Sequence, residues 1–132
     1  MSTAELERNL KEFTGDEFFT RLEKHVEYVI PAIVKRILTV NAYDNARSLS
    51  DFDSNSIEEI ESFMRYDFND SMIDDNETAF DYYGVFHKTK TNFKIVSGHR
   101  KIIRSLAETC RKLCGIQSTS SEAVSSEYYI GG

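Results

Sequence analysis

Apolar residues recur at helical spacing along most of the chain, and the pattern is strongest in residues 97–114. At 100° per residue, the apolar side chains of this stretch share one arc about 120° wide, the width expected of a core-facing helix. They are Ile102, Ile103, Leu106, Cys110, Leu113 and Cys114. We expect Ser97 to cap the start of this helix and Gly115 to follow its end. The sequence therefore predicts one long amphipathic helix here.

Shorter periodic stretches predict the remaining helices, at 2–13, 16–30, 31–40, 46–49 and 57–66. The apolar face of the second stretch extends to Val29 and Ile30, and Pro31 is expected to begin a new helix, because proline suits a first turn and not a helix interior. Ser56 stands three residues before Glu59, which is the spacing of a capping box. Together these patterns predict an all-α fold, a compact bundle of five to six helices.

Three stretches lack a helical period. Residues 67–84 hold six acidic residues and few aliphatic ones, so we expect a long, exposed acidic loop there. Phe93 and Ile95 alternate with Lys94, and this alternation allows a short extended segment before the last helix. Residues 115–132 are Ser-rich and non-periodic, which predicts a disordered tail after a single helical domain at 1–114.

The charge is distributed unevenly along the chain. The 132 residues carry a net charge of −6. Residues 1–84 hold 8 Lys/Arg against 19 Asp/Glu, whereas residues 85–114 hold 8 Lys/Arg against one acid, Glu108. This asymmetry indicates an acidic and a basic surface on one domain. An equally strong alternative is that the two halves neutralise each other within the fold.

The two charged surfaces supply the candidate binding residues. The basic set, opposite or beside the apolar arc of the last helix, is Arg100, Lys101, Arg104 and Arg111. The acidic set, on the helix at 57–66, is Glu58, Glu59 and Glu61. Arg104 and Glu108 are four residues apart, so we expect an intrahelical pair worth a few tenths of a kcal/mol. The remaining basic side chains are then free for an acidic partner.

Catalytic and metal-binding patterns are not found in the sequence. There is no recognisable nucleophile motif and no glycine-rich phosphate loop, so we expect no enzyme activity and no cofactor. The acids of 67–84 do not have the spacing of a calcium-binding loop, and we expect no metal site. His99 is interpreted as a half-buried residue at a helix start.

The cysteines and the apolar runs bear on the compartment. Cys110 and Cys114 lie four apart on one helix, which disfavours a mutual disulfide, so we expect both to be buried, reduced thiols. Reduced thiols indicate the nucleus or the cytoplasm. The longest apolar run, 29–34, is too short to cross a membrane, and no membrane partner is expected.

Two segments resemble a known family. IPAIVKRILTVNAYDNARSLSDFDSNSIEEIESFM (30–64) and GHRKIIRSLAE (98–108) are similar to the short helices and to the closing helix of a sterile alpha motif (SAM) domain. The resemblance implies a SAM-like bundle that associates with proteins, often through a basic closing helix meeting an acidic mid-domain surface; a few members bind RNA. It assigns Arg100, Lys101 and Arg104 to the basic side, with Glu58, Glu59 and Glu61 as candidates for the acidic one.

These observations favour a non-enzymatic protein–protein interaction module, an adaptor or a self-associating domain. Its partner is expected to be another protein or a second copy of the chain. The alternative is a nucleic-acid-binding domain that uses the basic surface of residues 88–112. The overall acidity of the chain disfavours that alternative, as does the lack of exposed aromatics interleaved with the basic residues.

Overall fold

The computed structural model describes residues 10–115 and confirms the all-α class. Its helices are α2 (Gly15–Val26), α3 (Ala32–Val40), α4 (Ala46–Ser50), α5 (Ser54–Ser62), α6 (Ala79–Tyr83) and α7 (Ser97–Leu113). Short 3-10 or π turns join them at η1 (Phe63–Asp67), η2 (Asp70–Met72), η3 (Gly84–Phe86) and η4 (Lys90–Asn92). Residues 10–12 are helical, and the rest of the predicted helix at 2–13 lies outside the described residues. So does the predicted tail, apart from Gly115.

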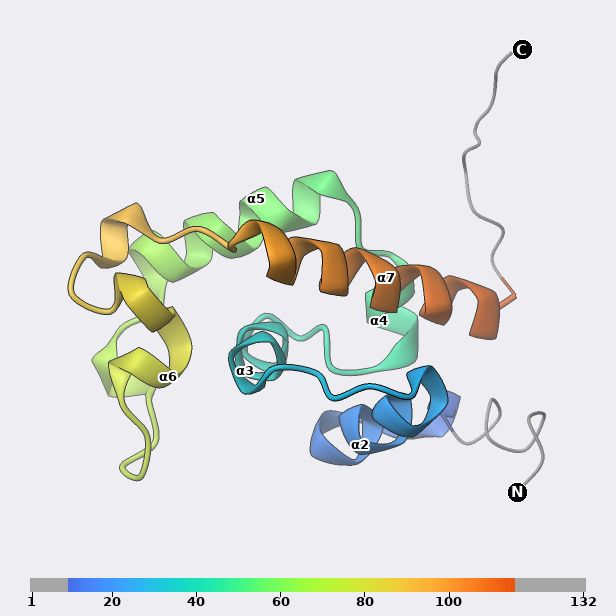
Figure 1. Ribbon diagram of the computed structural model, residues 1–132. Helices are drawn as coiled ribbons and strands as arrows, with labels where there is room; N and C mark the ends of the chain where they lie inside the picture. The colour runs from blue at the N-terminus through green and yellow to red at the C-terminus, as the bar shows by residue number, and fades with distance from the viewer. Residues whose placement is uncertain (1–9, 116–132) are drawn as a thin grey trace, which may run out of the picture.

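Helix α7 is the longest element and runs along the molecule (Figure 1). Ile103, Leu106 and Cys110 are fully buried, and α4 packs against this face. Each fully buried Leu or Ile contributes about 1.5–3 kcal/mol relative to an exposed one, so this face is a major source of stability. The N-cap is Val96 and not Ser97, because the extended backbone of the preceding segment continues through residue 96.

Helix α2 ends four residues earlier than predicted. Glu27 adopts the left-handed conformation, with φ of 65°, and closes the helix after Val26. The carboxylate of Glu23 accepts a hydrogen bond from the backbone N–H of Ile30 at 2.7 Å and holds the turn that follows. Val29 is consequently 80% exposed and does not lie on a buried helix face. Ile30 remains in the core, but from the loop.

The next three helices follow the predicted order. Helix α3 begins at Ala32, one residue later than predicted, and Pro31 is its N-cap residue. Asn45 caps α4 by accepting a hydrogen bond from the N–H of Ser48. In α5 the capping box joins Asp53 and Ser56, so the predicted pairing of Ser56 with Glu59 was wrong. The cap shifts because Asp53 already accepts from the N–H of Ser56.

Residues 67–84 are not the simple exposed loop that the sequence predicted. They contain η2 and α6, and Phe68, Tyr82 and Tyr83 are buried. The hydroxyl of Tyr83 donates to the backbone oxygens of Met64 and Phe68, at 2.7 and 3.1 Å. The hydrogen bond to Met64 ties the segment to η1, and the one to Phe68 joins the two ends of the segment. The acidic residues are largely exposed, whereas the aromatic residues anchor the segment in the core.

One carboxylate of this segment joins it to α3. Glu77 accepts a hydrogen bond from Nε of Arg36 at 2.7 Å and another from the hydroxyl of Tyr82. The hydrogen bond from Tyr82, followed by the one from Arg36, lowers the pKa of Glu77 below 4.5. Burial and the bond to Glu77 raise the pKa of Tyr82 to about 12. Glu77 is therefore bound in its charged form, and Tyr82 stays protonated as a donor.

The segment before α7 is extended, although it pairs with no strand among the described residues. Phe93 and Ile95 are buried and Lys94 is exposed, as the alternating pattern predicted. The backbone N–H of Ile95 donates to the carboxylate of Glu61 at 2.8 Å. Nε of Arg65 donates to the carbonyl oxygen of Phe93 at 2.6 Å. Side chains from α5 and η1 thus replace the strand that would otherwise satisfy this backbone.

Candidate functional site

The basic surface of α7 consists of three side chains, Arg100, Lys101 and Arg104, which we call the basic face. Lys101 and Arg104 are exposed, and Arg100 is half-buried. None of the three forms an ion pair with another described residue, and the same holds for Lys24, Lys88 and Lys112; what distinguishes the three is that they lie together on one helix. The basic face therefore presents three positive charges to solvent that residues 10–115 leave unneutralised.

Arg111, the fourth predicted basic residue, does not belong to this face. Its guanidinium donates to the carbonyl oxygens of Ser50 and Phe52, at 3.4 and 3.1 Å, and pairs with Glu108 at 3.2 Å. Glu108 therefore pairs with Arg111, and the predicted pair between Arg104 and Glu108 was wrong. Arg111 is the better partner because it also satisfies two backbone carbonyls at the α4–α5 connection. Arg111 is thus engaged by contacts within the fold, whereas Arg104 has no ion-pair partner among residues 10–115.

The predicted acidic set also divides into two parts. Glu58 and Glu59 lie exposed on α5. The side chain of Glu61 is only 13% exposed, because its carboxylate is taken up by Arg65 and by the N–H of Ile95. Glu61 therefore holds the segment before α7, and only Glu58 and Glu59 remain available for a partner.

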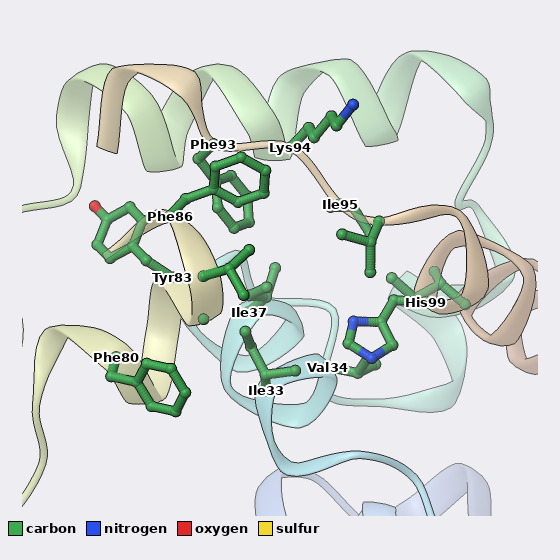
Figure 2. Close-up of a pocket in the computed structure, with 14 residues that line it drawn as sticks. Ile33, Val34, Ile37, Phe80, Tyr83, Phe86, Phe93, Lys94, Ile95 and His99 are labelled. Carbon is green, nitrogen blue, oxygen red and sulfur yellow. The ribbon is translucent and has the colours of Figure 1, made fainter. Parts of the chain in front are cut away.

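A second surface was not predicted from the sequence. It is a half-open cleft of about 270 Å³ between α3, the α6–η3 turn and the start of α7 (Figure 2), which we call the apolar cleft. Ile33 and Ile37 form one wall, and Phe80 and Val85 contribute from the other side. Almost the whole lining is apolar, and no acidic residue takes part in it.

Gly84 shapes the apolar cleft. Its φ is 56°, a conformation that glycine adopts far more readily than other residues. A Cβ at this position would stand 3.1 Å from Cδ1 of Ile33, so the backbone passes close to the α3 wall. The turn directs Val85 outward, where it is 78% exposed; Phe80 is 56% exposed. The rim thus holds large apolar side chains in contact with water.

The side chains of Cys110, Cys114 and His99 are buried or half-buried. Cys110 is fully buried and free, and burial raises the pKa of its thiol to about 12, which disfavours the nucleophilic thiolate. Cys114 is only half-buried because it is the C-cap of α7, so the prediction that both thiols are buried was wrong for this one. His99 is half-buried, as predicted, and lines the apolar cleft. Among residues 10–115, no group of three His, Cys, Asp or Glu side chains could hold a metal ion.

Comparisons with protein families, with curated proteins and with solved structures gave no match for this chain. Over the part of the chain that the structure describes, no helix combines the length and the apolar character needed to cross a membrane.

Proposed function

We propose that this chain is a non-enzymatic protein-association module that binds an acidic protein surface through the basic face of α7. The observation that carries the proposal is that Arg100, Lys101 and Arg104 have no ion-pair partner among residues 10–115. Arg111, on the same helix, forms hydrogen bonds with the backbone of Ser50 and Phe52. The three side chains of the basic face form no such bond with another described residue, and they lie together on one face.

The energetics favour an external acidic partner. Arg100 and Arg104 are four residues apart, and two like charges at this spacing destabilise a helix by a few tenths of a kcal/mol. A carboxylate on a partner would remove that cost. Charge complementarity of this kind mainly speeds association and excludes wrong partners. The exposed pair Glu58 and Glu59 makes a second copy of the chain one such partner.

The same assignment agrees with a SAM-like arrangement, which we infer from the sequence resemblance. Gly98, His99 and Arg100 lie in the first turn of α7, where the closing helix of that family begins. The resemblance gives the basic side of that helix a role in association. It would give Glu58 and Glu59 the complementary role.

Charge reversal tests the proposal. In the variant Arg100→Glu/Arg104→Glu, protein capture from a nuclease-treated cell extract should fall to background, because like charges across an interface cost several kcal/mol. A matched control is Lys11→Glu/Lys24→Glu, two exposed lysines elsewhere. Both variants should melt close to the wild type, since exposed positions contribute little. Equal capture by the variant and the control would contradict the proposal.

The same variants distinguish nucleic-acid binding. If the variant Arg100→Glu/Arg104→Glu lost only a salt-dependent gel shift with RNA or DNA, while protein capture persisted, the basic surface of 88–112 would be a nucleic-acid site. Such binding weakens steeply with salt because it releases counterions.

A further inference from the structure

The apolar cleft is slightly smaller than a typical small-molecule pocket. Its volume of about 270 Å³ is just below the range of about 300–1,000 Å³ typical of such pockets. A cleft of this size suits one or two side chains that project from a larger molecule. Its half-open form, with Val85 and Phe80 exposed at the rim, would let such a molecule continue over the surface.

The apolar lining determines which side chains can bind in the cleft. Ile33, Ile37 and Phe93 present hydrocarbon and offer an occupant almost no hydrogen-bonding groups, so the inserted side chains must be apolar. Figure 2 shows Ile33 and Ile37 directed into the cleft from α3, and the ring of His99 on the α7 side, near Val34 and Ile95. Exposed apolar surface of this kind marks an interaction site in many proteins.

Charge at the rim restricts the occupant further. Lys94 and His99 are the only lining residues that can be positively charged, and no aspartate or glutamate lines the cleft. Lys94 lies at the edge with its amine directed away from the apolar floor (Figure 2). An acidic group beside the inserted side chains would meet a cation there and no carboxylate of the lining.

We propose that the apolar cleft binds a short segment of a partner protein in which two apolar side chains stand next to an acidic residue. The proposal rests on the proposed function only in that the chain associates with proteins. It uses a surface separate from the basic face. The apolar residues insert between α3 and the α6–η3 turn, and the acid lies beside Lys94.

Selection from a phage-displayed random peptide library, with the full chain as bait, tests this inference. The enriched peptides should share two apolar residues and an adjacent Asp or Glu. Synthetic copies should bind at least about tenfold more weakly to the variant Val85→Glu. The matched control is Val29→Glu, because Val29 is 80% exposed and lies outside the cleft, in the loop between α2 and α3. It should bind the peptides like the wild type.

Two lysines test the charge at the rim. Lys94→Glu should weaken binding of the acidic peptides, and Lys101→Glu, on the basic face, should leave it unchanged. The two proposals can therefore fail independently. Peptides without an acid, or equal binding to Val85→Glu and Val29→Glu, would overturn the inference. Self-association that Val85→Glu abolishes would also overturn it, because the occupant would then be a second copy.

Discussion

Arg111 and Glu61 are charged side chains that each form hydrogen bonds with the backbone of a distant part of the chain. Arg111 binds the carbonyl oxygens at the end of α4 and the start of the α4–α5 connection. Glu61 binds the N–H of Ile95, thirty-four residues away. At the scale of single residues, these two contacts fix α7 and the segment before it against the rest of the molecule. Within residues 10–115 they leave the basic face without an ion-pair partner.

Replacing Arg111 should therefore destabilise the fold. In Arg111→Ala the carbonyl oxygens of Ser50 and Phe52 and the carboxylate of Glu108 lose their donor. We expect a loss of about 1–3 kcal/mol in the free energy of unfolding, measured by urea denaturation. Lys112→Ala, at the exposed neighbouring position, should stay within about 0.5 kcal/mol of the wild type. Equal stability of the two variants would show that the Arg111 contacts are not structural.

At the scale of elements, the segment at 67–84 is a packed part of the fold. Phe68 lies against the rings of Tyr82 and Tyr83, with centroid distances of 5.0 and 6.1 Å. Glu77 ties the segment to α3 through Arg36. Excising it would remove aromatic burial and one half-buried ion pair, so we expect replacement of this acidic segment by a linker to lower stability.

A pair of substitutions within the segment measures this effect. Phe68→Ala should lower the free energy of unfolding by about 3–5 kcal/mol, as for other buried phenylalanines. Met72→Ala, at a position that is 52% exposed, should change it by no more than about 0.5 kcal/mol. Urea denaturation of both variants gives the comparison. Similar small effects would mean that the segment is an exposed loop after all.

Acid should weaken the link between this segment and α3. The folded state lowers the pKa of Glu77 below its usual value of 4.5, so its contribution to stability is complete above that pH. The contribution is lost as the pH falls through the lowered pKa, where the carboxylate takes up a proton. The urea midpoint of the wild type should therefore decrease below about pH 4.5. The urea midpoint of Glu77→Gln should decrease less on acidification. The control Glu58→Gln, at an exposed position on α5, should show the same decrease as the wild type. An unchanged acid response in Glu77→Gln would contradict this role.

The sequence predicted the elements whose period is long enough to be recognised. Helix α7 has more than four turns, and its buried residues follow the predicted arc. Helix α6 has five residues and the turn η2 has three, which is too few to show a helical period of apolar residues. The sequence therefore predicted a loop at 67–84. The early end of α2 depends on the left-handed Glu27 and the long-range contact of Glu23, which periodicity does not show.

At the scale of the whole molecule, the candidate surfaces were predicted only in part, because contacts between distant segments decide which side chains remain free. Arg104 and Arg111 are both at helical spacing from Glu108, and only the carbonyl oxygens of Ser50 and Phe52 decide between them. The apolar cleft joins residues near 33, 85 and 96, which the fold alone brings together. Sequence could locate the basic face on one helix, but it could not locate a surface shared by three segments.

If the basic face contacts a protein, site-specific photo-crosslinking from this face should capture that protein. A photo-reactive amino acid replaces Lys101 in the full chain, and a control carries it at Thr20, an exposed position on α2. After irradiation in a nuclease-treated cell extract, position 101 should give a discrete protein adduct that position 20 does not give. The added substitution Arg104→Glu should remove it. A lack of adducts at position 101, or identical adducts at both positions, would contradict the account.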